Sequence, residues 1–255
     1  MFGRWLCLLL LGCCWVVMAD PLRVAAAQSL PPYVLSDTHS GAELDVVREA
    51  LASQGITLEV VYVPFGRLAA TLEQGVTEAA FPVQPGQGAA SLYFSDVHMI
   101  YTNAVFALAE RQLDIRSVAD LACCSVLAFR QAPLILGDEF RHMAERNPAY
   151  SETVLQQSQI EMLVNRRVDV AVMDENIFHY YLSRYEQRQF DTRQIPPIER
   201  LYRFSPSPYR VAFVNAAQRD AFNRGLQQLR DSGRYEAILQ RYFQSPQSIK
   251  AGHPD

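Results

Sequence analysis

The sequence is poor in lysine, in basic runs and in the short motifs of common enzymes. Lys250 is the only lysine among 23 basic residues, and 27 acidic residues leave a net charge of -4. A weakly acidic chain of this kind is a poor candidate for binding nucleic acid or anionic membranes. No phosphate loop, dinucleotide fingerprint or Gly-x-Ser-x-Gly elbow is present, and the five histidines show no ligand spacing. We therefore expect no metal site and no cofactor.

The first 19 residues have the pattern of a secretory signal peptide. Arg4 precedes an apolar run over residues 5–18, and Ala19 is a small residue at the expected cleavage point. This run is shorter than the roughly 20 apolar residues that span a bilayer. We expect cleavage after Ala19, a mature chain of 236 of the 255 residues, and a periplasmic location. Two alternatives stay open, an uncleaved anchor and lipid attachment at Cys13, because residues 10–13 resemble a lipobox.

Cleavage would leave two cysteines, the neighbours Cys123 and Cys124. Adjacent cysteines cannot form an ordinary disulfide at normal Cα separation. A strained bridge that acts as a redox switch is one interpretation. The pattern favours the other, two small apolar residues at the entrance of a strand.

Strands and helices alternate along the rest of the chain. The first half predicts strands over 22–27, 56–63 and 78–81, and helices over 40–55 and 66–74. The second half predicts strands over 125–129 and 170–173, and helices over 135–146 and from 158 onward. Each half contains a capping box, Ser40 with Glu43 and Ser158 with Glu161. Residues 72–81 also echo residues 163–172, so we infer two α/β lobes of similar build.

Two crossings join these lobes in the predicted organisation. A strand over 103–109 leads into the second lobe, and a strand over 209–214 returns before two final helices that are separated at Gly233. Crossings near 105–110 and 200–210 imply a two-segment hinge. The predicted division is 1–19 signal peptide, 20–107 and 201–255 lobe one, and 108–200 lobe two. The carboxyl ends of parallel strands then face an interlobe cleft where a ligand would bind.

Several side chains follow strands at this predicted cleft. Tyr33 and Phe65 are aromatic residues that either sandwich a ligand or fill the core of lobe one. Arg67 opens a helix, where a cation next to the positive end of the dipole either binds an anion or is left in solvent. Arg130 and Gln131 follow the first strand of lobe two, where Arg130 either binds the ligand or pairs with the other lobe.

The order of several short motifs resembles that of the polar-amino-acid-type periplasmic solute-binding proteins, family three. These motifs are Pro-Pro-Tyr at 31–33, Val-Pro-Phe-Gly-Arg at 63–67, Phe-Ser-Asp at 94–96, Asp-Val-Ala-Val-Met-Asp at 169–174 and Gly-Arg-Tyr-Glu-Ala-Ile at 233–238. The resemblance implies a type II periplasmic-binding-protein fold, in which each lobe is a sheet flanked by helices. It also implies a monomer that captures a small polar solute for an ABC transporter permease or a membrane sensor.

The resemblance also implies site residues. Asp174 matches the acidic residue that receives a ligand ammonium, although a helix N-cap also explains it. The family's carboxylate-binding arginine is replaced by Pro-Gly-Gln-Gly-Ala-Ala at 85–90, and our hypothesis is that Arg130 substitutes for it. Periplasmic dehydratases are similar to this family, and if this chain were one of them, Glu175 would be the candidate proton donor. The predicted ligand-binding set is Tyr33, Phe65, Arg67, Phe81, Gln84, Arg130, Gln131, Asp174 and Glu175, with no catalytic residue.

Overall fold

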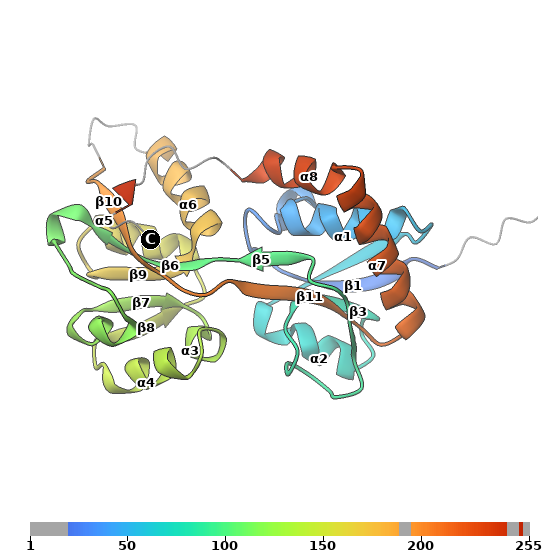
Figure 1. Ribbon diagram of the computed structural model, residues 1–255, viewed down its shortest axis with the longest axis horizontal. Coiled ribbons are helices and arrows are strands. Elements are labelled where there is room, and N and C mark those ends of the chain that lie inside the picture. Colours follow the sequence, from blue (N-terminus) through green and yellow to red (C-terminus); the bar gives the residue numbers. More distant parts are fainter. Residues whose placement is uncertain (1–19, 189–194, 244–249, 252–255) are drawn as a thin grey trace, which may run out of the picture.

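Two mixed sheets, each covered by helices on both faces, lie side by side in the computed structural model of the protein (Figure 1). The structure describes residues 20–188, 195–243 and 250–251. The expected signal peptide, 1–19, and Cys13 within it lie outside the described residues. Among the helices of the described segments, none has the length and apolar character needed to cross a membrane.

Lobe one contains a six-stranded sheet in the order β2-β1-β3-β11-β4, with β5 paired to β11. Its strands are β1 (Leu22–Ala27), β2 (Leu58–Val63), β3 (Ala79–Val83), β4 (Tyr93–Phe94), β5 (Met99–Tyr101) and β11 (Ser207–Phe213). Its helices are α1 (Ala42–Ala52), α2 (Leu68–Glu73), α7 (Ala216–Asp231) and α8 (Arg234–Tyr242). Strands β1, β2 and β3 run parallel, whereas β11 is antiparallel to β3. Helices α1, α7 and α8 lie on one side of the sheet and α2 lies on the other (Figure 1).

Lobe two contains a sheet in the order β12-β10-β6-β9-β7-β8. Its strands are β6 (Asn103–Leu108), β7 (Val126–Phe129), β8 (Tyr150–Thr153), β9 (Val170–Asp174), β10 (Ile198–Arg203) and β12 (Lys250–Ala251). Its helices are α3 (Ala132–Ile135), α4 (Asp138–Arg146), α5 (Gln156–Val164) and α6 (Glu175–Arg188). Strands β7, β8 and β9 are parallel, so their carboxyl ends share one edge. That edge faces lobe one.

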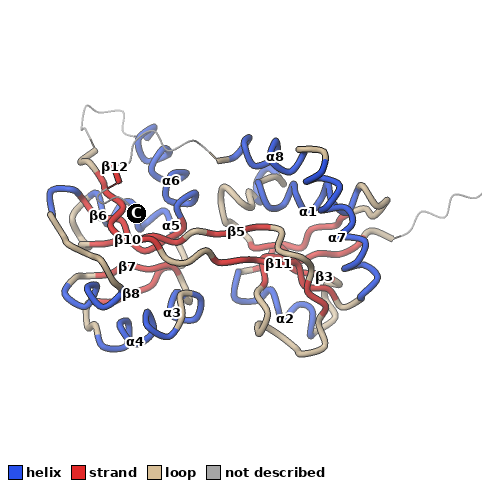
Figure 2. The backbone as a smooth tube through the Cα atoms, in the orientation of Figure 1, coloured by secondary structure: helices blue, strands red, loops and turns tan. Residues whose placement is uncertain are grey.

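The chain passes between the lobes twice, and Figure 2 shows the two segments running next to each other. The first passage is Thr102, between β5 and β6, and the second is residues 204–206, between β10 and β11. Strands β6 and β10 pair with each other and lie wholly in the sheet of lobe two. The predicted division instead placed most of β6, the end of β10 and all of β12 in lobe one. Hydrogen bonding to β9 holds β6 in lobe two.

Both predicted capping boxes are wrong, for reasons that local sequence does not contain. Helix α1 begins after Gly41, where an added Cβ would lie 2.3 Å from the carbonyl oxygen of Tyr33. The Glu43 carboxylate turns into the core instead of back to the helix terminus. Ser158 lies inside α5 and donates to the carbonyl of Leu155. The helix predicted over 135–146 begins later, as α4 at Asp138, and a separate short helix, α3, ends at Ile135, with Gly137 at a positive φ between them.

Candidate functional site

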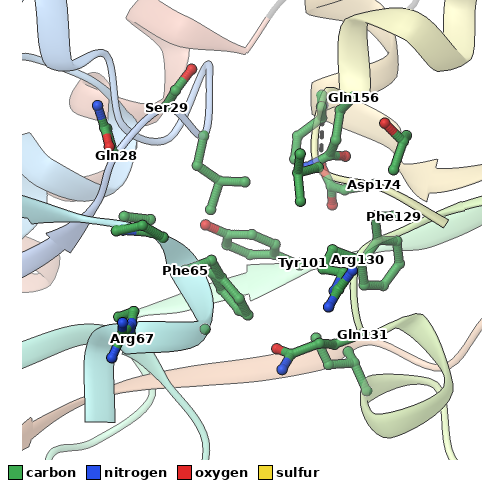
Figure 3. Close-up of a pocket in the computed structure, with 18 of the residues that line it drawn as sticks. Gln28, Ser29, Phe65, Arg67, Tyr101, Phe129, Arg130, Gln131, Gln156 and Asp174 are labelled. Atoms are coloured by element: carbon green, nitrogen blue, oxygen red, sulfur yellow. Dashed lines mark hydrogen bonds between the residues drawn. The ribbon is translucent and has the colours of Figure 1, made fainter. Parts of the chain in front are cut away.

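A cavity of about 800 Å³ lies between the lobes, at the carboxyl ends of their parallel strands (Figure 3). Lobe one contributes the segment after β1 and the turn after β2. Lobe two contributes the segments after β7, β8 and β9. The lining residues are Ala27, Gln28, Ser29, Leu30, Ser36, Asp37, Pro64, Phe65, Gly66, Arg67, Tyr101, Asn103, Phe129, Arg130, Gln131, Ile135, Thr153, Val154, Gln156, Asp174, Ile177 and Tyr209.

Asp174 is the most deeply buried acidic residue of this cavity. It ends β9 with 2% of its surface exposed, and its Oδ1 caps α6 by accepting from the backbone N–H groups of Asn176 and Ile177 at 2.9 and 3.1 Å. Its Oδ2 accepts from the N–H of Thr102 at 2.8 Å. Burial raises the pKa of Asp174 to about 7, against the lowering effect of these hydrogen bonds. The N-cap role and a position in the cavity are therefore combined in one residue.

Tyr33 connects the two lobes but does not line the cavity. Its hydroxyl donates to Asp174 Oδ1 at 2.9 Å and accepts from Asn176 Nδ2 at 3.0 Å. Its ring is fully buried and stacks on Tyr101 with the ring centroids 3.9 Å apart. A position in the core of lobe one, the alternative left open by the sequence, is what the structure shows. Tyr101 takes the cavity-facing place that the sequence predicted for Tyr33.

Two arginines line the cavity from opposite lobes. Arg67 ends a short helical turn over Phe65–Arg67, and Arg130 follows β7 directly. Both side chains are exposed. Within the described residues neither guanidinium has a carboxylate at ion-pair distance, in contrast to Arg200 and Arg203. The two cavity arginines are therefore available to a bound anion.

Phe65 of lobe one and Gln131 of lobe two lie at a second place where the lobes come close together in the cleft. Gln131 has a positive φ of 67°, and its backbone N–H donates to Glu152 Oε2 at 2.8 Å. A Cβ placed on Gly66, next to Phe65, would lie 3.6 Å from Gln131 Nε2. Figure 3 shows Phe65 on one side of the cavity and Phe129 on the other. The prediction that Phe65 and Gln131 lie at the cleft is consistent with this placement.

Three further members of the predicted set lie away from the cavity. Phe81 is fully buried in lobe one, and its ring meets His98 edge-on. Gln84 is half-buried, and its backbone N–H donates to the side chain of Gln87. Glu175 points to β10, where Arg200 donates at 3.0 Å and Arg203 donates through two nitrogens at 2.9 and 3.0 Å. Phe81 and Glu175 depart from the prediction because their partners, His98 and the two arginines, are distant in sequence and a motif does not reveal them.

Sequence reasoning missed Gln156, the first residue of α5. Gln156 lines the cavity, and its Oε1 is a buried acceptor without a hydrogen-bond donor among the described residues. Figure 3 shows it beside Asp174. Recognition of β8 would have placed Gln156 after a strand at the cleft edge. The sequence of β8, Tyr-Ser-Glu-Thr, carries no apolar alternation that would have marked it.

A buried polar network supports the floor of the cavity from lobe one. Glu43 Oε2 accepts from the Tyr101 hydroxyl at 2.8 Å, and Glu43 Oε1 lies 2.7 Å from His98 Nε2. All three residues are almost fully buried. Burial raises the pKa of Tyr101 well above its usual value, so this hydroxyl keeps its proton as a donor to Glu43. Among the described residues no group of three or more histidine, cysteine or acidic side chains could hold a metal ion.

One family of proteins matches most of the chain. The model of the bacterial extracellular solute-binding proteins, family 3, matches residues 22–245. No curated protein sequence matches the chain.

Solved structures match the chain over most of its length. A histidine kinase sensor domain with similarity to periplasmic binding proteins gives a TM-score of 0.71 at 20% identity, covering 88% of this chain and 96% of that one. An ancestral arginine-binding protein bound to arginine gives 0.71 at 18% identity, covering 89% and 100%. An ancestral amino acid-binding protein, a precursor of cyclohexadienyl dehydratase, gives 0.67 at 17% identity, covering 88% and 96%. At these identities the likeness establishes a shared fold.

Proposed function

The chain belongs to the bacterial extracellular solute-binding proteins, family 3, and from this premise we propose that it captures a small amino-acid-like solute in its interlobe cleft. The fold is the two-lobed type II periplasmic-binding-protein fold. The observation that carries the proposal is the presence of one acidic and one basic side chain in the same cavity. Asp174 offers a carboxylate, and Arg130 offers a guanidinium without a protein partner among the described residues.

Asp174 and Gln156 have the acceptors that an amine needs. Oδ1 of Asp174 is already occupied by three donors, whereas Oδ2 accepts only one and keeps a free lone pair. Oε1 of Gln156 is buried and unpartnered, so an N–H donor there would remove the cost of an unsatisfied carbonyl. An ammonium between the two would also favour the ionised form of Asp174, because it supplies a nearby positive charge.

Arg130 is the arginine that we propose for the carboxylate of the solute. It lies in lobe two, as Asp174 does, and Figure 3 shows both on the same side of the cavity with Arg67 on the opposite side. A guanidinium binds a carboxylate through two parallel hydrogen bonds, which fixes the orientation of the solute. This arrangement compensates for the first-lobe arginine that the sequence lacks. Arg67 is then left for a second anionic group or for solvent.

Delivery of the solute to an ABC importer in the periplasm is the role that we propose for the closed, loaded protein. A sensor module is the second candidate, because one of the matched structures is a histidine kinase sensor domain. Uptake of the labelled solute by cells that lack this chain separates the two. Lost uptake supports transport, whereas normal uptake with a lost transcriptional response supports sensing.

We do not propose catalysis, because Glu175 does not line the cavity and is engaged by two arginines. The side chain that the sequence suggested as the proton donor of a dehydratase therefore points away from the cavity.

A thermal-shift screen of the mature protein against amino acids, polyamines and organic acids, followed by calorimetry with the best compound, tests the proposed binding mode. Arg130→Ala and Asp174→Asn should each weaken binding. For the buried Asp174 the expected loss is about 2–5 kcal/mol, the range for truncating one partner of a buried charge pair, and for the exposed Arg130 it is smaller. Arg116→Ala is the matched control, because Arg116 pairs with Asp114 on the surface of lobe two. Near-native affinity in Arg130→Ala with strong loss in Arg67→Ala would move the carboxylate to lobe one. Normal binding in both arginine variants, together with strong loss in Asp174→Asn, would identify a cation without a carboxylate.

A further inference from the structure

The cavity is large even though the lobes already touch. The hydroxyl of Tyr33 spans the lobes to Asp174 at 2.9 Å, and Gln131 lies against Gly66 at a second place. Within this arrangement about 800 Å³ remains, near the upper end of the roughly 300–1,000 Å³ typical of sites for drug-sized ligands. An amino acid with an ordinary side chain would leave much of this volume to water.

Part of the cavity lining is apolar. Phe129, Ile135 and Val154 line it from lobe two, and Leu30 and Phe65 line it from lobe one. These side chains cannot hydrogen-bond to water or to a polar solute. Covering them with a hydrocarbon group would release water and stabilise the complex by about 25 cal/mol for each Å² buried.

The apolar wall continues to the outside over the segment that follows β8. Val154 is 72% exposed and Leu155 is 69% exposed, and Val154 also lines the cavity. Leu134, which is 66% exposed, lies in α3, the helix that follows β7, and β7 is the parallel neighbour of β8. Isolated exposed leucines are ordinary in proteins, but large apolar side chains continuous with a binding cavity indicate contact with an apolar partner.

We propose that the solute is an amino acid whose apolar substituent is longer than any standard side chain and leaves the cleft over Val154 and Leu155. The inference rests on the proposed function, because it takes the polar end of the solute to be held by Asp174 and Arg130. The continuity between cavity wall and rim is what favours a part of the solute over a partner protein as the occupant of this surface.

A homologous series of L-2-amino acids tests the proposal by calorimetry. The probes are the 2-amino derivatives of butanoic, hexanoic, octanoic and decanoic acid. We expect binding to tighten by about threefold for each methylene added, slightly below the value for full burial. Val154→Asp and Leu155→Asp should remove most of the gain for the two longest members. Leu155→Asp should also leave the butanoic member unchanged, because Leu155 does not line the cavity. Val76→Asp is the matched control, because Val76 is 42% exposed in lobe one and does not line the cavity.

The outcomes separate this inference from the proposed function. A flat series in which the short member binds overturns the inference and leaves the proposed function standing. If decanoic acid binds as tightly as its 2-amino derivative, the apolar path stands and the amine contact to Asp174 fails. No binding by any member overturns the inference. A length dependence that Val154→Asp and Leu155→Asp leave intact also overturns it, and solute uptake lost in these variants would then assign the rim to a partner protein.

Discussion

Asp174 has an unusual protonation equilibrium for an aspartate, because burial outweighs the hydrogen bonds that it accepts. Its pKa is about 7 in the folded protein, against 3.8 for the unperturbed side chain. The folded state therefore holds this proton more tightly than the unfolded chain does. The resulting stabilisation is fully present below about pH 4 and is lost as the pH rises through 7.

We predict that this contribution to the free energy of unfolding of the ligand-free protein falls by on the order of 4 kcal/mol between pH 4 and pH 8. The figure follows from about 1.36 kcal/mol for each unit by which the folded and unfolded pKa values differ. Urea unfolding of the wild type and of Asp174→Asn at both pH values measures it, because the asparagine cannot titrate. The free energy of unfolding of the wild type should fall relative to that of the variant as the pH rises. Parallel pH profiles for the two proteins would contradict the raised pKa.

Cys123 and Cys124 are free thiols with their sulfur atoms 3.2 Å apart. Cys123 is exposed, whereas Cys124 is buried, and burial raises the pKa of its thiol to about 12. Because the thiolate is the reactive form, we predict that iodoacetamide at pH 8 modifies Cys123 at least tenfold faster than Cys124. Peptide mass spectrometry of timed samples measures both rates. Equal rates, or a two-proton mass deficit that shows a vicinal bridge, would refute the prediction.

Helices α1 and α7 approach so closely that only glycine fits between them. A Cβ on Gly225 would lie 2.0 Å from the carbonyl oxygen of Ala50, which is backbone and cannot rotate away. We predict that Gly225→Ala destabilises the protein by about 1–3 kcal/mol, the usual cost of overpacking, despite the higher helix propensity of alanine. Chemical denaturation measures the change. A variant as stable as the wild type would mean that the two helices separate without cost.

Sequence reasoning succeeds for elements whose pattern is local. Strand β1 has the predicted bounds, 22–27, and the predicted internal echo is confirmed in detail. Helix α2 ends at Glu73 with β3 beginning at Ala79, and α5 ends at Val164 with β9 beginning at Val170, so both helix-to-strand steps have the same length. In each case the apolar period and the turn residues are contained in about ten consecutive positions.

Sequence reasoning fails where a residue's structural role is set by a contact with a residue that is distant in the chain. Glu43 has the local pattern of a capping residue, yet its partners His98 and Tyr101 are more than 50 positions away. Strand β8 forms because it hydrogen-bonds to β7. Unless β8 is recognised, the sequence does not show that Gln156 follows a strand at the cleft. Five of the nine predicted site residues line the cavity, because residues that follow apolar strands can be located from sequence. Cross-lobe contacts such as that of Tyr33 with Asp174 cannot be located in this way.

At the scale of the whole molecule, the hydroxyl of Tyr33 is a connection between the lobes. We predict that Tyr33→Phe increases the radius of gyration of the ligand-free protein in small-angle scattering, because it removes the hydrogen bonds to Asp174 and Asn176. Tyr62→Phe is the control, since its hydroxyl contacts His39 of the same lobe. Saturating solute should return the Tyr33 variant to the compact form. An unchanged radius in the variant would show that other contacts hold the lobes together.

The beginning of the mature chain is a separate prediction for the molecule as a whole. Intact-mass analysis of the exported protein should give a chain that starts at Asp20, because Ala19 ends the apolar run. A chain that starts at an acylated Cys13 would replace this prediction with a membrane-attached form.

The threading of the chain through both lobes has a consequence for the order of events during synthesis. Residues 103–203 supply five of the six strands of lobe two in one continuous stretch, so this lobe can fold as soon as that stretch has emerged. Lobe one must wait for residues 207–242, which carry β11, α7 and α8. Until then one edge of β3 is unpaired and the face of α1 that packs on α7 is uncovered. An open strand edge is an aggregation hazard, so a delay between the emergence of β10 and that of β11, during synthesis or export, would extend the period of greatest risk for the chain.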